Sequence, residues 1–252
     1  KNKFSFAEKD TICPILITEL EKMVFQSPIV FNKTSENQIG VFTLQGLVPN
    51  RNQFVSNNHK WLGTYIPFKY RCYPFCLVLD GQNKSDKLIL AFNDDAGVIK
   101  ETKEPNSIRL FLDDGAPSEH LRKVMALMSE ANKAEQATKK CLGLIEELDL
   151  LSEWKITLKS EEKEKEITGL LKIDTEKLDK LKNEDFLALR NENALPLIYG
   201  HLFSLRNITR LTGNKKSSAA DSALQEPNLK ERALQKQKIN EKAELDSLVK
   251  NL

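Results

Sequence analysis

The sequence contains no long hydrophobic run and almost no net charge. Its apolar stretches all fall short of the roughly 18 to 20 consecutive apolar residues that a membrane-spanning helix needs. Its 38 basic and 36 acidic residues are intermixed, which leaves a formal net charge of +2. A chain without a basic field has no strong electrostatic attraction for phosphate backbones or anionic lipids. We therefore expect no transmembrane segment and no nucleic-acid partner.

Cysteine is scarce, and its spacing does not match a metal site. None of the four cysteines forms a CxxC pair; Cys72 and Cys76 have three residues between them, and no second His/Cys pair completes a zinc site. We expect reduced, buried thiols in a cytosolic protein, with no metal and no cofactor. The first seven residues have neither an initiator Met nor a signal-like apolar region. We therefore expect a processed or trimmed start and a cytoplasmic rather than a secreted protein.

The pattern of apolar residues predicts strands and helices in one chain. Alternation predicts a hairpin from residues 27–31 and 38–47, a further short strand within 47–55, and a second hairpin from 152–158 and 166–173. Residues 76–79 are predicted to form a buried strand, and 87–93 another strand. Ser118 is a suitable N-cap for a helix that runs to about residue 150. Further helices are expected after Asp174 or Thr175, over 184–191 and over 194–211.

These elements predict an α+β fold: a small, mostly antiparallel sheet covered by the helices at 118–150 and 194–211. Residues 1–213 would form a single domain. After Gly213 the composition shifts to a flexible linker and a charged tail over 214–252, either an amphipathic helix or disordered. Its apolar residues recur at helical spacing near the end, so residues 229–252 could dock on the domain, self-associate or bind a partner.

The stretch from residue 61 to residue 75 is rich in aromatic residues and proline. Trp61 and Tyr65 recur at helical spacing with Phe68, and Pro67 and Pro74 interrupt the pattern, which predicts a short helix that breaks between residues 67 and 73. Packing explains the aromatic side chains. It does not explain Arg71, which must find a carboxylate, backbone carbonyls or a ring because it cannot lose its charge.

The helix expected at 194–211 has one apolar face and one mixed face. The mixed face carries Tyr199, Phe203, Arg206 and Arg210 at spacings of four, three and four residues. His201 lies with apolar neighbours, so we interpret it as a core histidine rather than as a ligand or base. Ser204 is one turn away, but two side chains on one helix rarely point at a common reacting atom.

Two acidic turns are expected, at residues 94–97 and 113–117. Neither continues with oxygen ligands at alternate positions and a bidentate Glu at position twelve, as an EF-hand loop would. Both are interpreted as solvated turns, with no metal site.

Four ordered motifs carry a resemblance to a known family. They are Trp61…Tyr65-Ile66-Pro67…Tyr70-Arg71…Tyr73-Pro74-Phe75, Leu110-Phe111…Asp113…Gly115…Pro117-Ser118, Gly169-Leu170…Ile173-Asp174, and Ile198-Tyr199…His201-Leu202…Ser204-Leu205…Asn207…Arg210-Leu211. On these motifs the chain resembles the bacterial SapC family over about residues 10 to 212. The resemblance implies a role in surface-layer biogenesis and serum resistance, and it implies no catalytic residues. Cys72 stands where the family commonly has a second arginine.

Two functions from different classes remain open. The first is a non-enzymatic accessory protein of the surface-layer or outer-membrane protein system that binds a protein or peptide. The second is an uncharacterised peptide-acting enzyme, or an enzyme subunit, that uses His201 with Arg71 or Asp113. We favour the first, because the sequence shows no catalytic constellation. The residues expected to bind are Trp61, Tyr65, Arg71, Tyr73, Tyr199, His201, Arg206, Asn207 and Arg210.

Overall fold

Five antiparallel strands form the central sheet. The computed structural model describes residues 4–79, 88–93, 99–101, 107–159 and 164–212. The strand order is β1-β3-β2-β7-β6, with β1 (Ile12–Pro14), β2 (Ile29–Lys33), β3 (Ile39–Leu44), β6 (Leu151–Lys159) and β7 (Glu164–Ile173). The pairs β2–β3 and β6–β7 are the two hairpins that the sequence predicts. They meet at the centre of the sheet, where the register pairs Phe31 of β2 with Leu171 of β7.

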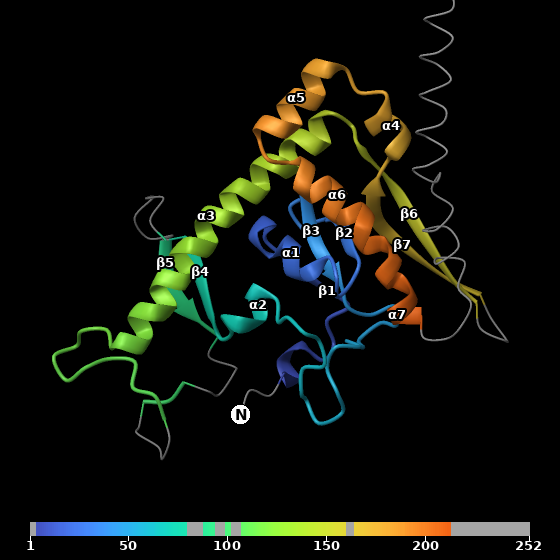
Figure 1. Cartoon of the computed structure of the whole chain (residues 1–252). Helices are drawn as coiled ribbons and strands as arrows, with labels where there is room; N and C mark the ends of the chain where they lie inside the picture. Colours follow the sequence, from blue (N-terminus) through green and yellow to red (C-terminus); the bar gives the residue numbers. More distant parts are fainter. Residues whose placement is uncertain (1–3, 80–87, 94–98, 102–106, 160–163, 213–252) are drawn as a thin grey trace, which may run out of the picture.

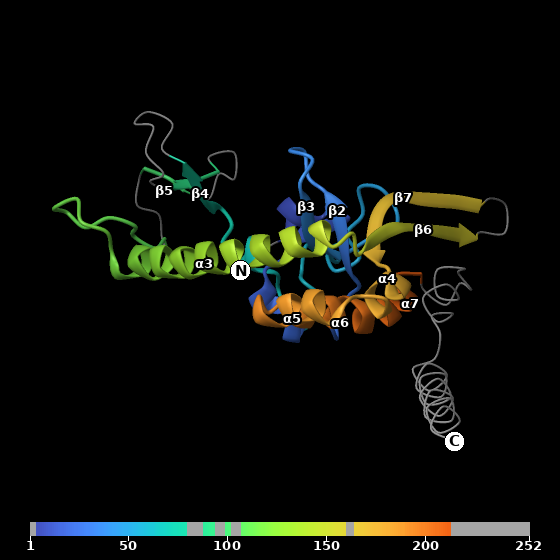
Figure 2. The same cartoon turned by 90° about the horizontal axis from the view of Figure 1, so that it is seen from above.

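From residue 118 onward the helices follow the predicted order, whereas the helix at Leu20–Met23 was not predicted and the one expected over 194–211 is divided in two. They are α1 (Leu20–Met23), α2 (Phe68–Arg71), α3 (Glu119–Glu147), α4 (Thr175–Asp179), α5 (Asn183–Asn191), α6 (Leu195–Ser204) and α7 (Ile208–Thr212), with a 3-10 turn, η4 (Leu205–Asn207), between the last two. The side chains of Ser118 and Asp174 cap α3 and α4 by accepting backbone N–H donors. Figure 2 shows α5, α6 and α7 along one side of the sheet, and the N-terminal half of α3 extending beyond it.

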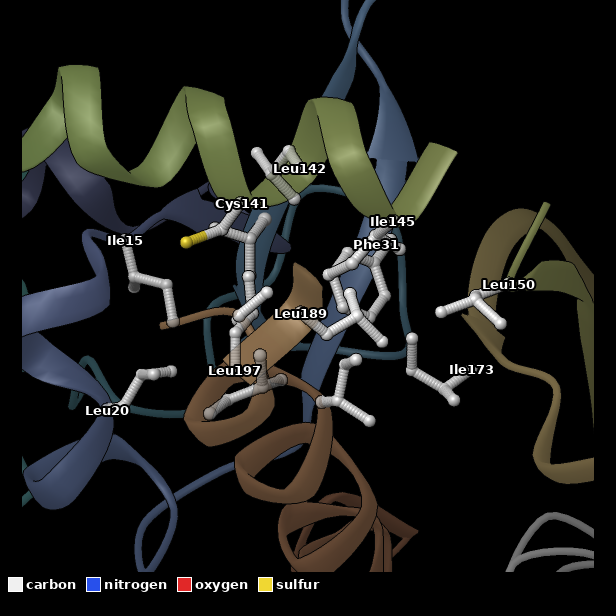
Figure 3. Packing of buried hydrophobic residues seen from close by; sticks show 14 of the residues in the cluster. Ile15, Leu20, Phe31, Cys141, Leu142, Ile145, Leu150, Ile173, Leu189 and Leu197 are labelled. Carbon is white, nitrogen blue, oxygen red and sulfur yellow. The ribbon is translucent and has the colours of Figure 1, made fainter. Parts of the chain in front are cut away.

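The main core lies where α3, α5 and α6 meet the sheet. Cys141, Leu142 and Ile145 extend from the C-terminal half of α3, and Leu189 and Leu197 face them from α5 and α6 (Figure 3). Other buried members of this cluster come from β2 and β7, among them Phe31 and Ile173. The chain is therefore an α+β protein, with antiparallel sheets and covering helices, as the sequence predicts.

Beta strands 4 and 5 stand apart from the central sheet. β4 (Phe75–Leu79) and β5 (Leu88–Phe92) pair antiparallel with each other and form a separate two-stranded sheet. Figure 1 shows them at the end of the molecule where the N-terminal half of α3 lies. The prediction of a buried strand at 76–79 is wrong in its burial, because Val78 is 42% exposed. A ribbon of two strands does not have the layers that would cover both of its faces.

Two other predictions need correction. Residues 47–55 contain no strand, only an isolated bridge between Val55 and Trp61, because Pro49 breaks the ladder and Asn50 adopts a positive φ of 59°. The short helix begins after Pro67 rather than before it, since Pro67 is extended (ψ 145°) and serves as the N-cap of α2. The predicted turn at 94–97 and the tail at 214–252 lie outside the described residues.

Candidate functional site

Four of the nine predicted site residues meet at one short turn: Tyr65, Asn207 and Arg210 contact it, and Trp61 reaches it through Tyr65. This turn, residues 24–26, connects α1 to β2, and we call it the 24–26 turn. From the C-terminal helices, the side-chain amide of Asn207 donates to the carbonyl of Val24 at 2.7 Å, and Arg210 Nη1 donates to the carbonyl of Phe25 at 2.6 Å. Both contacts join residues more than 180 positions apart in sequence. The η4–α7 segment therefore fixes the backbone of the turn from one side.

The aromatic segment fixes the same turn from the other side, through Gln26. The Gln26 side chain accepts a hydrogen bond from the Tyr65 amide at 2.8 Å and donates one to the Tyr65 carbonyl at 2.9 Å. Trp61 Nε1 donates to the same carbonyl at 3.0 Å. Gly63 makes the approach possible, because a Cβ there would lie 2.6 Å from Gln26 Oε1. The Gln26 side chain thus makes the pair of hydrogen bonds to the Tyr65 backbone that a neighbouring β-strand would make.

A buried carboxylate orders the region around Tyr65. Glu19 is 2% exposed, and its Oε1 accepts hydrogen bonds from the Tyr65 hydroxyl at 3.0 Å and from the Phe68 amide at 2.6 Å. Burial, and next the charge of Glu19, raise the pKa of Tyr65 to about 12, so its hydroxyl stays protonated and donates.

Arg71 lies on the outer side of this network. Its guanidinium donates to the Tyr65 hydroxyl at 2.7 Å and to the Ile66 carbonyl at 3.1 Å, and it lies 3.9 Å from Glu19 Oε1. It also covers the Tyr65 ring at 5.2 Å from the centroid. The expectation that Arg71 would find a carboxylate, carbonyls or a ring is confirmed, since it finds all three.

The surface next to the 24–26 turn is aromatic and cationic. Phe25 is 75% exposed, which is the largest exposure of any large apolar side chain in the described part. Tyr199 and Phe203 of α6 are 39% and 57% exposed, and their rings lie 6.4 Å apart. Arg206 is exposed and makes no side-chain hydrogen bond or ion pair within the described ranges. We call Phe25, Tyr199, Phe203, Arg206 and Arg210 the Phe25 surface.

Helix α1 runs beside α6 at this surface. Gly200 lies under α1, where a Cβ would touch Val24 Cγ2 at 3.4 Å. Phe203 follows three residues later and Asn207 seven residues later, so both lie near the same side of the helical segment as Gly200. Gly200 and Asn207 both approach Val24, so helical spacing puts the exposed Phe203 on the side of the segment that faces the turn. Sequence analysis missed Phe25, because it follows Met23 and Val24 in a short apolar run typical of a core segment.

His201 is a core residue that joins two strands. It is fully buried (0% exposed), its Nε2 accepts a hydrogen bond from the Ile173 amide at 3.1 Å, and its Nδ1 donates to the Ile29 carbonyl at 2.7 Å. Continuing the Phe31–Leu171 register by two residues would pair Ile29 with Ile173. The imidazole therefore bridges the Ile173 amide and the Ile29 carbonyl, in place of direct backbone hydrogen bonds between these two strands. Burial lowers the pKa of His201 to about 4, so the ring is neutral at neutral pH.

The geometry of His201 leaves no ring nitrogen for a substrate. The neighbouring Ser204 hydroxyl is also occupied by backbone hydrogen bonds: it accepts one from the Ile29 amide at 2.8 Å and donates one to the His201 carbonyl at 2.7 Å. Asp113 pairs with Arg109 in the segment before α3, and Arg71 pairs with Tyr65. The three residues of the enzymatic alternative thus have separate structural partners and do not contact one another.

The remaining predicted residues also have packing roles. Tyr73 stacks on Phe6 with ring centroids 3.8 Å apart, and Asn207 is 5% exposed. All four cysteines are free, and three of them are buried, as predicted; Cys76 is half-buried. Within the described residues, no group of three or more His, Cys, Asp or Glu side chains could hold a metal ion.

Comparison with known proteins gives one match. No helix in the described part is long and apolar enough to cross a membrane. No curated protein and no solved structure matches the chain. The sequence model of the SapC family matches residues 1–211, which include every residue of the 24–26 turn and of the Phe25 surface. The chain therefore belongs to the SapC family.

Proposed function

We propose that this SapC-family protein is a non-enzymatic binding protein that captures a protein or peptide through the Phe25 surface. The exposure of Phe25 on a turn held from both sides carries the proposal. Burying one phenylalanine side chain at an interface contributes about 2–3 kcal/mol, and aromatic and arginine side chains dominate binding energy at interfaces. A turn that is already fixed loses little conformational entropy on binding, so more of this energy becomes affinity.

The flanking arginines indicate the chemistry of the partner. Arg206 and Arg210 border the aromatic side chains, and Arg71 covers Tyr65 on the other side of the turn. A partner with an apolar patch bordered by carboxylates would complement this arrangement. Ion pairs at the rim of an interface govern the association rate, and salt screens them. Raising the ionic strength should therefore slow association more than it speeds dissociation.

The biological setting of the proposal comes from the family. SapC proteins are associated with the surface layer, which supports a partner from the surface-layer or outer-membrane protein system. Serum resistance would then be a consequence of a correctly assembled cell envelope. We place the protein in the cytoplasm as an accessory factor, with residues 1–213 as the binding domain and 214–252 as a linker and tail. Fractionation of the source cells tests this location.

Affinity capture from source cells tests the proposed function. The full-length chain and the Phe25→Ser variant are each used as bait, and bound polypeptides are identified by mass spectrometry. Leu187→Ser is the matched control, because Leu187 of α5 is also exposed (48%) but lies outside the Phe25 surface. We expect cell-envelope polypeptides to be enriched by the wild-type and Leu187→Ser baits and lost with Phe25→Ser. Equal capture by all three baits would refute the role of this surface.

A further inference from the structure

The chain leaves the described part of the molecule beside the Phe25 surface. α7 (Ile208–Thr212) is the last described element, and its Arg210 belongs to the surface. The Arg210 guanidinium donates to the Phe25 carbonyl at 2.6 Å, so the described part ends two residues after a direct contact with the 24–26 turn. Residues 213–252 follow in the sequence. They are therefore tethered next to the exposed aromatic side chains.

The end of the sequence combines an apolar stripe with carboxylates. The stripe lies within residues 241–252, which we call the tail segment, and consists of Leu245, Leu248, Val249 and Leu252. Its spacings of three, one and three residues put all four side chains on one face of a helix. Successive residues of a helix lie about 100° apart, so Glu244 and Asp246 border this face on opposite sides. As a helix, the tail segment would carry the apolar patch and carboxylate rim that complement the Phe25 surface.

The Phe25 surface offers the groups that such a helix needs. Phe25 and Phe203 are 75% and 57% exposed and supply apolar area. Arg206 is exposed and makes no side-chain hydrogen bond or ion pair within the described ranges, so it can pair with a carboxylate. A helix of about twelve residues is marginal alone in water. Contact with an apolar surface would supply the missing stabilisation.

The linker between α7 and the tail segment has a suitable length. A coil of about 28 residues, the length of 213–240, has a root-mean-square end-to-end distance of roughly 26–32 Å. This span reaches the surface easily, because Arg210 lies just before its start and contacts the Phe25 carbonyl. Such a tether gives an effective concentration of about 1 mM. Docking with an intrinsic dissociation constant of about 0.1 mM would then occupy the surface about 90% of the time.

We infer that the tail segment docks as an amphipathic helix on the Phe25 surface of its own chain, where it competes with the protein partner. The competition rests on the proposed function, whereas the docking itself does not. A tail that occupies the surface about 90% of the time weakens the apparent affinity for the partner about tenfold. The partner must displace the tail segment, so only a better-fitting apolar patch with carboxylates binds. The tail thus regulates the surface beside which it begins.

Photo-crosslinking of the purified full-length chain tests the docking without any partner. A photoreactive phenylalanine analogue replaces Phe25, and the protein is irradiated as an equal mixture of unlabelled and 15N-labelled chains. Mass spectrometry of the digested adducts should find peptides of the tail segment joined to the turn, with both halves carrying the same label. Adducts that join labelled to unlabelled halves in half of all cases would assign the contact to a second copy and overturn the inference. Finding no adduct with the tail segment would overturn it too.

Matched substitutions in the tail show whether the apolar stripe makes the contact. Leu245→Ser combined with Leu248→Ser should lower the yield of the adduct at least tenfold, because the stripe loses two of its four side chains. Leu224→Ser combined with Leu229→Ser is the matched control, since these leucines lie in the linker and the yield should not change. The analogue at position 187 in place of position 25 should give no tail adduct. Equal yields from the two double variants would refute docking through the stripe.

Capture from source cells separates this inference from the proposed function. With Leu245→Ser and Leu248→Ser in the bait, limiting bait should capture the same polypeptides about tenfold more efficiently than the wild type does. Equal capture by both baits would contradict the competition. A tail adduct without capture by either bait would contradict the proposed function and leave the docking intact. Capture by the wild-type bait without a tail adduct would overturn the docking and leave the proposed function intact.

Discussion

Replacing His201 should destabilise the protein by an amount that the structure predicts. Leucine has a similar volume but can neither accept from the Ile173 amide nor donate to the Ile29 carbonyl. Each buried backbone group left without a partner costs about 1–3 kcal/mol, so His201→Leu should lower the free energy of unfolding by about 2–6 kcal/mol. Glutamine has an oxygen and an N–H at comparable separation, so His201→Gln should lose less. Urea unfolding at neutral pH measures both changes.

The same contact predicts how stability depends on pH. The pKa of His201 is about 4 in the folded chain and 6.5 as a model value, so between these pH values the unfolded chain binds the extra proton. Stability that is present above pH 6.5 is therefore lost as the pH falls toward 4. Linkage gives a loss of about 2 kcal/mol between about pH 7 and about pH 5 from this residue.

The His201→Gln variant isolates this effect from other titrating groups. Its unfolding free energy should fall by about 2 kcal/mol less than that of the wild type over the same range of pH. His120→Gln, the same substitution at an exposed position of α3, is the matched control. Equal pH dependence in the wild type and His201→Gln would refute the bridging role of the neutral imidazole.

Two other predictions follow from glycine and cysteine environments. Gly143→Ala should stabilise α3 by about 1 kcal/mol, since a Cβ there meets nothing within 4 Å. Gly46→Ala should destabilise the folded protein, because its Cβ would lie 2.0 Å from the Arg51 carbonyl oxygen. Thermal unfolding of the two variants measures both effects. Burial raises the pKa of the Cys13 thiol to about 12 and that of Cys72 to about 11, so iodoacetamide at neutral pH should label both only after denaturation. Rapid labelling of native Cys13, detected by mass spectrometry, would contradict its burial.

Local patterns predicted much of the fold. The two hairpins, the N-cap at Ser118 and the helices after Asp174 each depend on residues close in sequence, and each is confirmed. β1 was missed, because three residues that include a proline carry too little alternation. The burial of β4 could not be predicted from its composition, since an apolar strand is buried only if the fold supplies a second layer.

The candidate site was predicted only in part, for a physical reason. Asn207, Arg210, Trp61 and Tyr65 were singled out, but the turn on which they converge depends on contacts between residues 39 to 185 positions apart. Gln26 carried no signal, since a lone glutamine in an apolar run has no characteristic spacing. Gln26 nevertheless connects the Arg71 region with the last helices, because its side chain contacts Tyr65 while Arg210 donates to the neighbouring carbonyl of Phe25.

Photo-crosslinking from position 25 in source cells tests the central claim most directly. A photoreactive phenylalanine analogue replaces Phe25, and in a matched experiment it replaces Leu187. We predict an adduct with a distinct cell-envelope polypeptide from position 25 and none from position 187. Adding Asn207→Ala, which removes the hydrogen bond to the Val24 carbonyl, should weaken the adduct because the turn loses one of its supports. No adduct from position 25, or the same adduct from both positions, would contradict the proposal that the 24–26 turn presents a binding surface.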